Sequence, residues 1–99
     1  MTITKTVEGS KLIIGVEGRL DTNTSPELEK ELSTSLDGVT DLIFDFTSLQ
    51  YVSSSGLRVL LATQKNINLK GGNMVVKNAN DEITEVFEIT GFDQILTLE

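Results

Sequence analysis

The residues best suited to do chemistry are three consecutive serines, Ser53, Ser54 and Ser55, followed by Gly56 and an apolar run. A serine hydroxyl acts as a nucleophile when a general base activates it, and histidine is the usual base. The sequence contains no histidine and no cysteine, which removes Ser-His pairs, thiolate catalysis and the usual zinc sites. We therefore expect no metal site, and a role for the serines other than nucleophilic catalysis.

Carboxylates are the remaining candidates for catalysis. The chain has 15 acidic residues, but no pattern places two of them in a shared cleft. No glycine-rich loop of nucleotide-binding form is present either. We therefore predict that the protein is not an enzyme and that it uses no cofactor.

Composition and charge limit the domain count and the partners. The chain has 99 residues, of which 38% are apolar, and only one proline, so we predict a single folded domain over residues 1–99. Eight basic residues and a net charge of −7 do not supply the clustered cations that phosphates need, so we expect no nucleic-acid and no membrane partner. Without a segment apolar enough for a signal peptide or a membrane span, the expected location is cytoplasmic.

The N-terminal part of the chain predicts a hairpin followed by a helix. Two β-branched runs, residues 2–7 and 11–17, flank a Glu-Gly-Ser turn, and Gly18 is expected to end the second strand. Pro26 is tolerated in the first turn of a helix, so a helix is expected to begin at about Ser25 and to stop at the next glycine. Its buried face is a leucine series at i, i+4 and i+8, formed by Leu28, Leu32 and Leu36.

The rest of the chain alternates between strand and helix. Strands are expected at residues 41–46, 74–77 and 95–98, and helices at residues 55–68 and 80–90. Residues 47–52 are interpreted as a connection that leads into the serines. Alternating strands and helices favour right-handed crossovers and a parallel sheet. The predicted fold class is α/β: a small domain with a mixed, mostly parallel sheet of four to five strands, helices packed against it, and an N-terminal antiparallel hairpin.

In such a fold the serines lie where the chain enters a helix. Backbone N–H groups at the start of a helix lack partners, and the helix dipole favours negative charge there. The position therefore suits an anion, including the phosphate of a modified serine. Serine is also a preferred N-cap residue, and spacing alone favours the simpler interpretation that Ser53 or Ser54 caps the helix.

The sequence resembles the STAS domains of the anti-sigma factor antagonist (anti-anti-sigma factor) family over nearly its whole length. The resemblance rests on the opening hairpin and on four segments: Gly18 to Asp21, Asp45 to Leu49, the serine segment, and the pair Gly71-Gly72. It implies a STAS-like fold and a single STAS domain over residues 1–99. Members of this family are small bacterial proteins that bind an anti-sigma factor and so release a sigma factor.

The family commonly has Asp-Ser-Ser-Gly where this chain has Ser-Ser-Ser-Gly. In that motif the serine after the aspartate is phosphorylated by the anti-sigma factor, a serine kinase of the GHKL ATPase type. The resemblance therefore implies that Ser54 is the phosphoacceptor and that Ser53 replaces the aspartate. It also implies that phosphorylation switches binding off, and that a phosphatase acting on phosphoserine restores it.

The resemblance further implies a partner-binding surface around the phosphoacceptor. Its expected residues are Asp21, Thr22, Asn23, Ser53, Ser55, Gly56 and Arg58. Two of them have a simpler interpretation, since Asp21 can hold its loop by hydrogen bonds and Arg58 can be plain exposed surface. Val59 is expected beside Arg58, off the buried face of its helix. Asp45 is expected to be structural, bonding N–H groups of the turn that follows its strand.

A second function stays open because Ser53 lacks the usual carboxylate. The chain can instead be a STAS module that binds a protein or a small ligand without being phosphorylated. Such a module would belong to a signalling or lipid-transport assembly.

Overall fold

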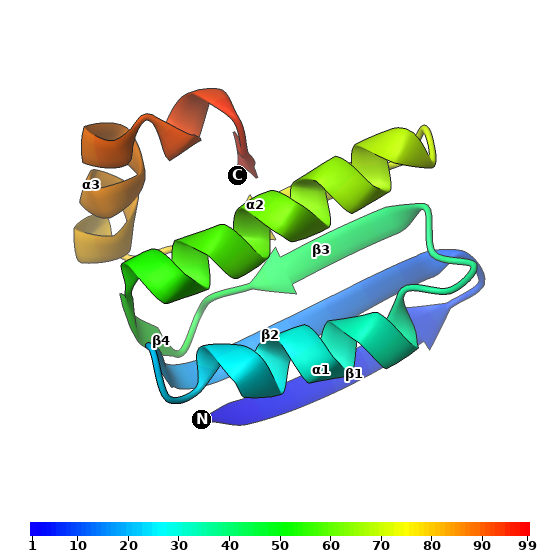
Figure 1. The fold of residues 1–99 in the computed structure, drawn as a ribbon, viewed down its shortest axis with the longest axis horizontal. Helices are drawn as coiled ribbons and strands as arrows, with labels where there is room; N and C mark the ends of the chain where they lie inside the picture. The colour runs from blue at the N-terminus through cyan, green and yellow to red at the C-terminus, as the bar shows by residue number, and fades with distance from the viewer.

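The computed structural model describes residues 1–99 and shows a sheet with helices packed against it (Figure 1). The strands are β1 (Thr2–Glu8), β2 (Lys11–Leu20), β3 (Asp41–Asp45), β4 (Leu49–Val52), β5 (Asn73–Lys77) and β6 (Thr97–Leu98). The helices are α1 (Ser25–Ser35), α2 (Ser54–Leu69) and α3 (Asp81–Thr90), with a short 3-10 helix, η1 (Phe92–Gln94). In Figure 1, α1 and α2 lie side by side on the near side of the sheet, with α1 in front of β2, and α2 packs against β5 and β4.

The sheet is mixed and mostly parallel, as predicted. Its strand order is β1-β2-β3-β5-β6, and β4 pairs with β2 outside this path, so there are six strands where four to five were expected. β1 and β2 form an antiparallel hairpin in which Glu8 pairs with Lys11, and the other pairings are parallel. The predicted α/β fold is confirmed, with one strand more than the sequence indicated.

The additional strand depends on the length of β2. This strand does not end at Gly18, as predicted, but continues to Leu20. Gly18 has a φ of 92°, a conformation that suits glycine, and the pairing register shifts between Gly18 and Arg19. From this point β2 pairs with β4, with Gly18 opposite Leu49 and Arg19 opposite Tyr51. Residues 47–52 were expected to be a connection into the serines, but most of them form the strand β4 (Leu49–Val52).

Local signals predicted the helices well. α1 has Pro26 in its first turn, and its predicted leucine face is buried: Leu28, Leu32 and Leu36. α3 is capped by Asn80, whose side-chain oxygen accepts a hydrogen bond from the Ile83 N–H at 2.8 Å, and it stops at Gly91, which has a φ of 79°. The predicted last strand is shortened to Thr97–Leu98 because η1 precedes it.

The core lies between the sheet and the helices. Alternate residues of the central strands are buried there, because successive side chains of a strand point to opposite faces. They are Leu12, Ile14 and Val16 of β2, Leu42 and Phe44 of β3, and Met74 and Val76 of β5. The edge strand β1 is tied to α1 by Lys5, which forms an ion pair with Glu31 and donates a hydrogen bond to Ser35.

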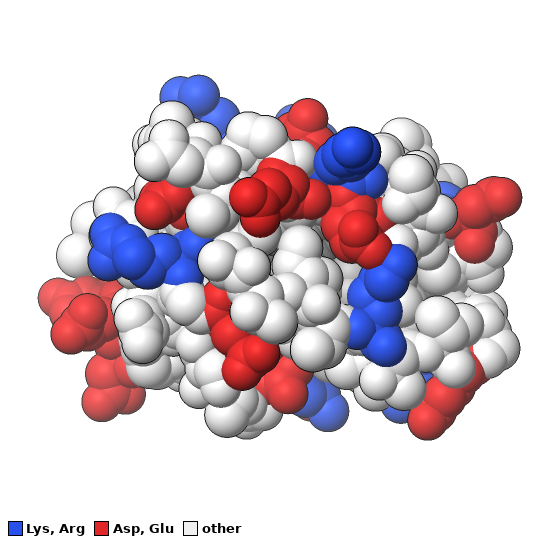
Figure 2. Space-filling model, turned by 90° about the horizontal axis from the view of Figure 1, so that it is seen from below, with Lys and Arg blue, Asp and Glu red and all other residues white.

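The surface carries charges of both signs. Figure 2 shows acidic and basic side chains interspersed over one face of the molecule, with no continuous basic area on that face. Together with a net charge of −7, this pattern gives a nucleic-acid backbone no row of cations to bind there. No helix combines the length and the hydrophobicity that a membrane span requires.

Candidate functional site

The serines and the Asp21 loop lie at one end of the sheet. β2 and β4 are parallel, so both end there, where α1 and α2 begin (Figure 1, left). The Ser53 N–H donates to the Leu20 carbonyl at 2.8 Å and so joins the end of β2 to the segment between β4 and α2. The carboxyl ends of parallel strands are the usual place for binding sites in α/β folds. The topology therefore brings residues 21–24 and 53–56 together.

The three serines have three different environments. Ser53 is the N-cap of α2, with an extended backbone, and its hydroxyl accepts a hydrogen bond from the Gly56 N–H at 3.3 Å. Ser55 is half-buried, and its hydroxyl lies 3.4 Å from that of Thr22. Ser54 is the first residue of α2, one residue earlier than predicted; it is exposed, and no hydrogen bond involves its hydroxyl. Capping thus belongs to Ser53, which leaves the Ser54 hydroxyl free.

The start of α2 also leaves backbone donors free. The Leu57 N–H is the first of the helix to reach a carbonyl, that of Ser53 at 2.9 Å. The N–H groups of Ser54 and Ser55 precede this bond, where a helix has no carbonyl to offer them. The first turn contains no acidic side chain. This end of α2 is therefore favourable for a negative charge added to Ser54.

Replacing the capping serine should change stability in a way that depends on the new side chain. Ser53→Ala removes the acceptor for the Gly56 N–H, so we expect the free energy of unfolding to fall by about 1 kcal/mol. Ser53→Asp keeps an acceptor and adds a negative charge at the helix start, so it should be at least as stable as the original protein. Urea unfolding measures both, with Ser54→Ala as the control that should change nothing. Equal stability of Ser53→Ala and the original protein would contradict the capping role.

Asp21 holds its own loop. Its Oδ1 accepts hydrogen bonds from the Asn23 N–H at 2.9 Å, the Thr24 N–H at 3.1 Å and the Thr24 hydroxyl at 3.2 Å. These bonds, first of all the one from the Thr24 N–H, lower the pKa of Asp21 below its ordinary value of 3.8, and nearby Arg19 adds to the effect. The contacts of Asp21 therefore favour the simpler interpretation, in which this residue holds its own loop by hydrogen bonds. The exposed residues of the loop are Thr22 and Asn23.

The lowered pKa of Asp21 predicts a dependence of stability on pH. Because ionised Asp21 is favoured in the folded state, its contribution is present above pH 3.8 and is lost as the pH falls through the folded-state pKa. Asp21→Asn should therefore lose less stability than the original protein as the pH falls below 3.8. Thermal unfolding between pH 7 and pH 2 measures this. Asp37→Asn removes an aspartate without hydrogen-bond partners and serves as the control, and parallel curves for Asp21→Asn and the original protein would contradict the prediction.

The first turns of α2 contain several buried residues, and one of them, Val59, corrects an expectation. Val59 is only 6% exposed and lies against α1, so it belongs to the core and not to a contact surface. Gly56 is buried as well, and a side chain at this position would meet Leu20 and Val52. It therefore sets how closely α2 approaches the sheet. Arg58, in contrast, is exposed and forms no ion pair.

Sequence reasoning missed two residues beside the site. Arg19 lies over the ring of Tyr51, with the guanidinium carbon 4.3 Å from the ring centroid. The guanidinium also approaches the carboxylate of Asp21, with 3.7 Å between Nε and Oδ2. The pairing depends on β4, which the sequence did not indicate. The only available signals were the single tyrosine of the chain and a glycine placed directly before the arginine.

Asp45 takes the structural role that was expected. It accepts hydrogen bonds from the Thr47 N–H at 3.0 Å and the Thr47 hydroxyl at 2.5 Å, and from the Asn78 amide at 3.1 Å. These bonds, led by that of the Thr47 hydroxyl, lower the pKa of Asp45. The carboxylate thus fixes the turn after β3.

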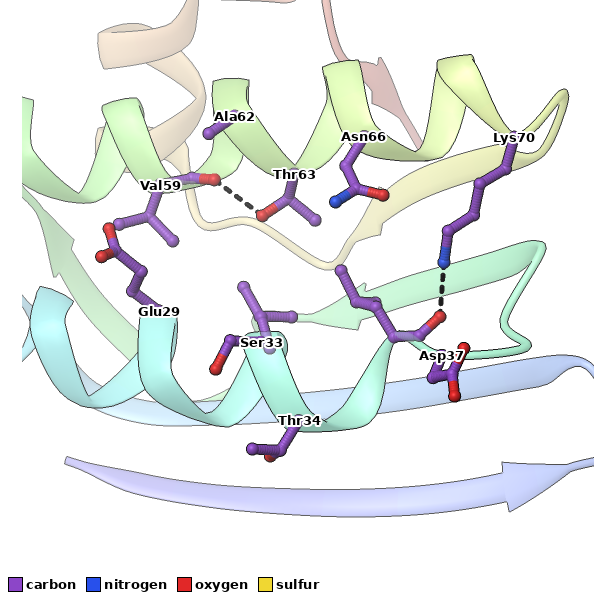
Figure 3. Close-up of a pocket in the computed structure, with 11 residues that line it drawn as sticks. Glu29, Ser33, Thr34, Asp37, Val59, Ala62, Thr63, Asn66 and Lys70 are labelled. Carbon is purple, nitrogen blue, oxygen red and sulfur yellow. Dashed lines mark hydrogen bonds between the residues drawn. The ribbon is translucent and has the colours of Figure 1, made fainter.

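A hollow of about 770 Å³ lies between α1 and α2 (Figure 3). The buried side chains that line it are Leu32, Leu36, Val59 and Thr63. As Figure 3 shows, the Thr63 hydroxyl donates to the Val59 carbonyl at 2.7 Å and the Lys70 amine to the Leu36 carbonyl at 2.5 Å. Two of its polar groups are therefore already engaged: Thr63 bonds within α2, and Lys70 joins the C-terminal ends of α2 and α1. A smaller hollow beside it, lined in part by Thr22, Ser55 and Arg58, leads to the serines.

Comparison with known proteins finds the same family that the sequence resembles. The family model of the STAS domain matches residues 2–99. A putative anti-sigma factor antagonist of Bordetella bronchiseptica, BtrV, is 35% identical over 82 residues, which are 82% of this chain and 71% of that protein. An anti-sigma-B factor antagonist of Staphylococcus aureus is 30% identical over 97 residues, which are 97% of this chain and 90% of that protein.

Solved structures share the fold. The Bacillus cell fate determinant SpoIIAA, in its phosphorylated form, superposes with a TM-score of 0.78 at 21% identity. The match covers 99% of this chain and 91% of that one. The fold of this chain is therefore one that SpoIIAA also has.

Proposed function

Because this chain belongs to the STAS domain family, and within it to the anti-sigma factor antagonists, we propose that it binds an anti-sigma factor that is a serine kinase. Binding releases a sigma factor, and phosphorylation of Ser54 switches binding off. The observation that carries the proposal is the exposed Ser54 hydroxyl, which has no hydrogen-bond partner, while Ser53 caps α2 and Ser55 lies against Thr22. The protein acts as one STAS domain, in the cytoplasm.

Phosphorylation at Ser54 needs no refolding of the domain. The modified side chain gains about −1.5 to −2 of charge and three acceptor oxygens. The free N–H groups of Ser54 and Ser55 lie at the same helix start, and Arg58 follows one turn later without an ion-pair partner. The phosphate can therefore remain at the surface, where it acts on the partner and not on the fold.

The same charge prevents the partner from binding. An anti-sigma factor that covers the start of α2 buries a neutral hydroxyl, which costs far less than burying a charge. Once Ser54 carries a dianion, the partner must desolvate that charge or leave. The surface that the partner covers is formed by the exposed Thr22 and Asn23 and by Ser55 and Arg58, with Asp21, Ser53 and Gly56 holding it in shape. A phosphatase acting on phosphoserine restores binding.

Ser53 modifies this switch without removing it. Serine retains the capping role, through the 3.3 Å hydrogen bond from the Gly56 N–H. It brings no negative charge next to Ser54, so the phosphate meets no repulsion from its neighbour. An aspartate would differ in charge but not in its ability to cap.

Phosphorylation in vitro tests the proposal. The protein is incubated with the purified anti-sigma factor of its own organism and ATP, and the phosphorylated position is mapped by mass spectrometry. We expect one phosphate at Ser54 and none in Ser54→Ala. A phosphate at Ser55 or Thr22, or no phosphate at all, would contradict the assignment.

A second candidate function is the binding of a small ligand without phosphorylation. The hollow between α1 and α2 favours it, since about 770 Å³ is the size of a ligand site. Against it, the Lys70 amine and the Thr63 hydroxyl already bond to carbonyls of α1 and α2 (Figure 3). The hollow therefore has fewer free polar groups to orient a ligand than its size suggests. Binding of an anti-sigma factor, switched by phosphorylation of Ser54, is the better supported function.

A further inference from the structure

We propose that Arg19 and Tyr51 form a second contact element for the anti-sigma factor, and that this element takes a carboxylate of the partner. The inference rests on the proposed function and adds to it a pair that lies beside the expected surface. The neighbours Leu20 and Val52 are buried against the helices. Because side chains alternate along a strand, Arg19 and Tyr51 point to the opposite face of the sheet.

A β-bulge in β4, opposite Gly18 and Arg19 of β2, creates the pair. Gly18 lies opposite Leu49 and Arg19 lies opposite Tyr51, so Gln50 has no partner in β2. This extra residue in β4 brings the ring directly across from the guanidinium, and a regular register would have placed Gln50 there. Bulges often turn a side chain towards a functional surface. The stacked pair is therefore a product of the backbone and not a chance contact of two flexible side chains.

The guanidinium of Arg19 is held in place but not saturated. The Tyr51 ring lies 4.3 Å from its central carbon, and Asp21 Oδ2 lies 3.7 Å from Nε. None of its five N–H donors makes a hydrogen bond within the protein. The Arg19 side chain is 58% exposed. Its outer edge is thus free to bind a carboxylate through two parallel hydrogen bonds, which is the geometry that arginine favours.

The pair also has the composition of an interface anchor. Tyr51 is 40% exposed, so the partner can cover one large aromatic side chain together with the charge. Tyrosine and arginine are the residues most often found at binding hot spots. Because the ring and Asp21 already restrain Arg19, less side-chain entropy is lost on binding. A small inorganic anion would use only the guanidinium, whereas a protein surface with an acidic side chain uses both parts of the pair.

The charge distribution of the chain supports an acidic partner group at this place. The chain has only two arginines, Arg19 and Arg58, and a net charge of −7. Arg58 follows Ser54 by one helical turn, and Arg19 is joined to the serines through the bond between Leu20 and Ser53. Both arginines of an acidic protein therefore lie close in the fold to the serine segment, Arg58 on α2 and Arg19 on the strand whose next residue bonds to Ser53.

Calorimetry with substituted proteins tests the inference. The probe is the purified anti-sigma factor of the same organism, used without ATP so that Ser54 stays unmodified. We expect Arg19→Gln and Tyr51→Ala each to bind about 10- to 30-fold more weakly than the original protein. Tyr51→Phe keeps the ring and should stay within about threefold. Lys11→Gln, which removes a positive charge at the other end of β2, is the matched control and should stay within about twofold.

Two further measurements make the outcome decisive. Thermal unfolding should show that the variants remain folded, since both side chains are exposed. The double variant should lose less than the sum of the two single losses, because each residue positions the other. If Arg19→Gln and Tyr51→Ala bind as the original protein does while Ser54→Asp binds weakly, the inference is wrong and the proposed function stands. An equal loss in Lys11→Gln would overturn the inference too, and an absence of binding by the original protein would overturn both.

Discussion

Ser54→Asp is expected to bind the anti-sigma factor at least about 100-fold more weakly than Ser54→Ala. Ser54 is exposed, and its hydroxyl bonds to nothing in the domain, so alanine removes no contact that the fold needs. Aspartate places a charge where the partner covers the start of α2. Burying an uncompensated charge costs several kcal/mol, and a 100-fold change corresponds to only about 2.7 kcal/mol. Phosphoserine carries more charge than aspartate and should weaken binding further.

The measurement compares Ser54→Asp, Ser54→Ala, Ser10→Asp and the original protein by the same calorimetric titration. Ser10→Asp adds an identical charge at an exposed serine in the hairpin turn, at the opposite end of β2, and should bind like the original protein. Both aspartate variants have the same net charge, so a difference between them reports the position of the charge. Equal affinities of Ser54→Asp and Ser54→Ala would remove Ser54 from the switch.

The serine segment illustrates what spacing can and cannot decide. Ser53 and Ser54 are both plausible caps from sequence, because capping depends on the backbone angles of a residue and those angles are not written in its type. The structure gives Ser53 the extended backbone of an N-cap and leaves Ser54 inside the helix with a free hydroxyl. One serine can therefore cap the helix while its neighbour accepts the phosphate. Residue type and spacing alone could not establish this division of roles.

Elements with strong local signals were predictable. The hairpin of β1 and β2 has β-branched strands around a glycine turn, α1 has a proline and a leucine series, and α3 has an asparagine cap and a glycine stop. Each of these signals acts within a few residues of the chain. β4 lacks such a signal: its burial runs from Leu49 to Val52 as buried, exposed, exposed, buried, which breaks the alternation of a regular strand. The strand exists because β2 continues past a bulge, and a bulge depends on two segments far apart in sequence.

The same reason explains the errors at the site. Val59 looks exposed on a helical wheel centred on the leucines of α2, but α1 packs against that side and buries it. Arg19 and Tyr51 become neighbours only through the register of β2 and β4. Contacts between elements were thus what the sequence could not supply, while the elements themselves mostly followed from local chemistry.

Gly56→Ala is expected to lower the free energy of unfolding by about 2 kcal/mol. An added Cβ would lie 2.8 Å from Leu20 Cγ and 2.9 Å from Val52 Cγ2, closer than carbon atoms pack. Leu20 and Val52 are at most 3% exposed, so neither has room to move. Alanine in place of glycine in a helix would otherwise add about 1 kcal/mol of stability. A loss of stability therefore indicates that close packing dominates, and a gain would indicate that helix propensity dominates.

Urea unfolding in two backgrounds measures this effect. In Leu20→Ala two of the three nearest atoms are gone, so Gly56→Ala should cost less there than in the original protein, and the difference is the coupling between the two positions. A shift of α2 away from the sheet would also move Ser54, so phosphorylation by the anti-sigma factor should slow in Gly56→Ala and recover in part in the double variant. If Gly56→Ala is as stable as the original protein in both backgrounds, the close approach of α2 to β2 and β4 does not hold the phosphoacceptor in place.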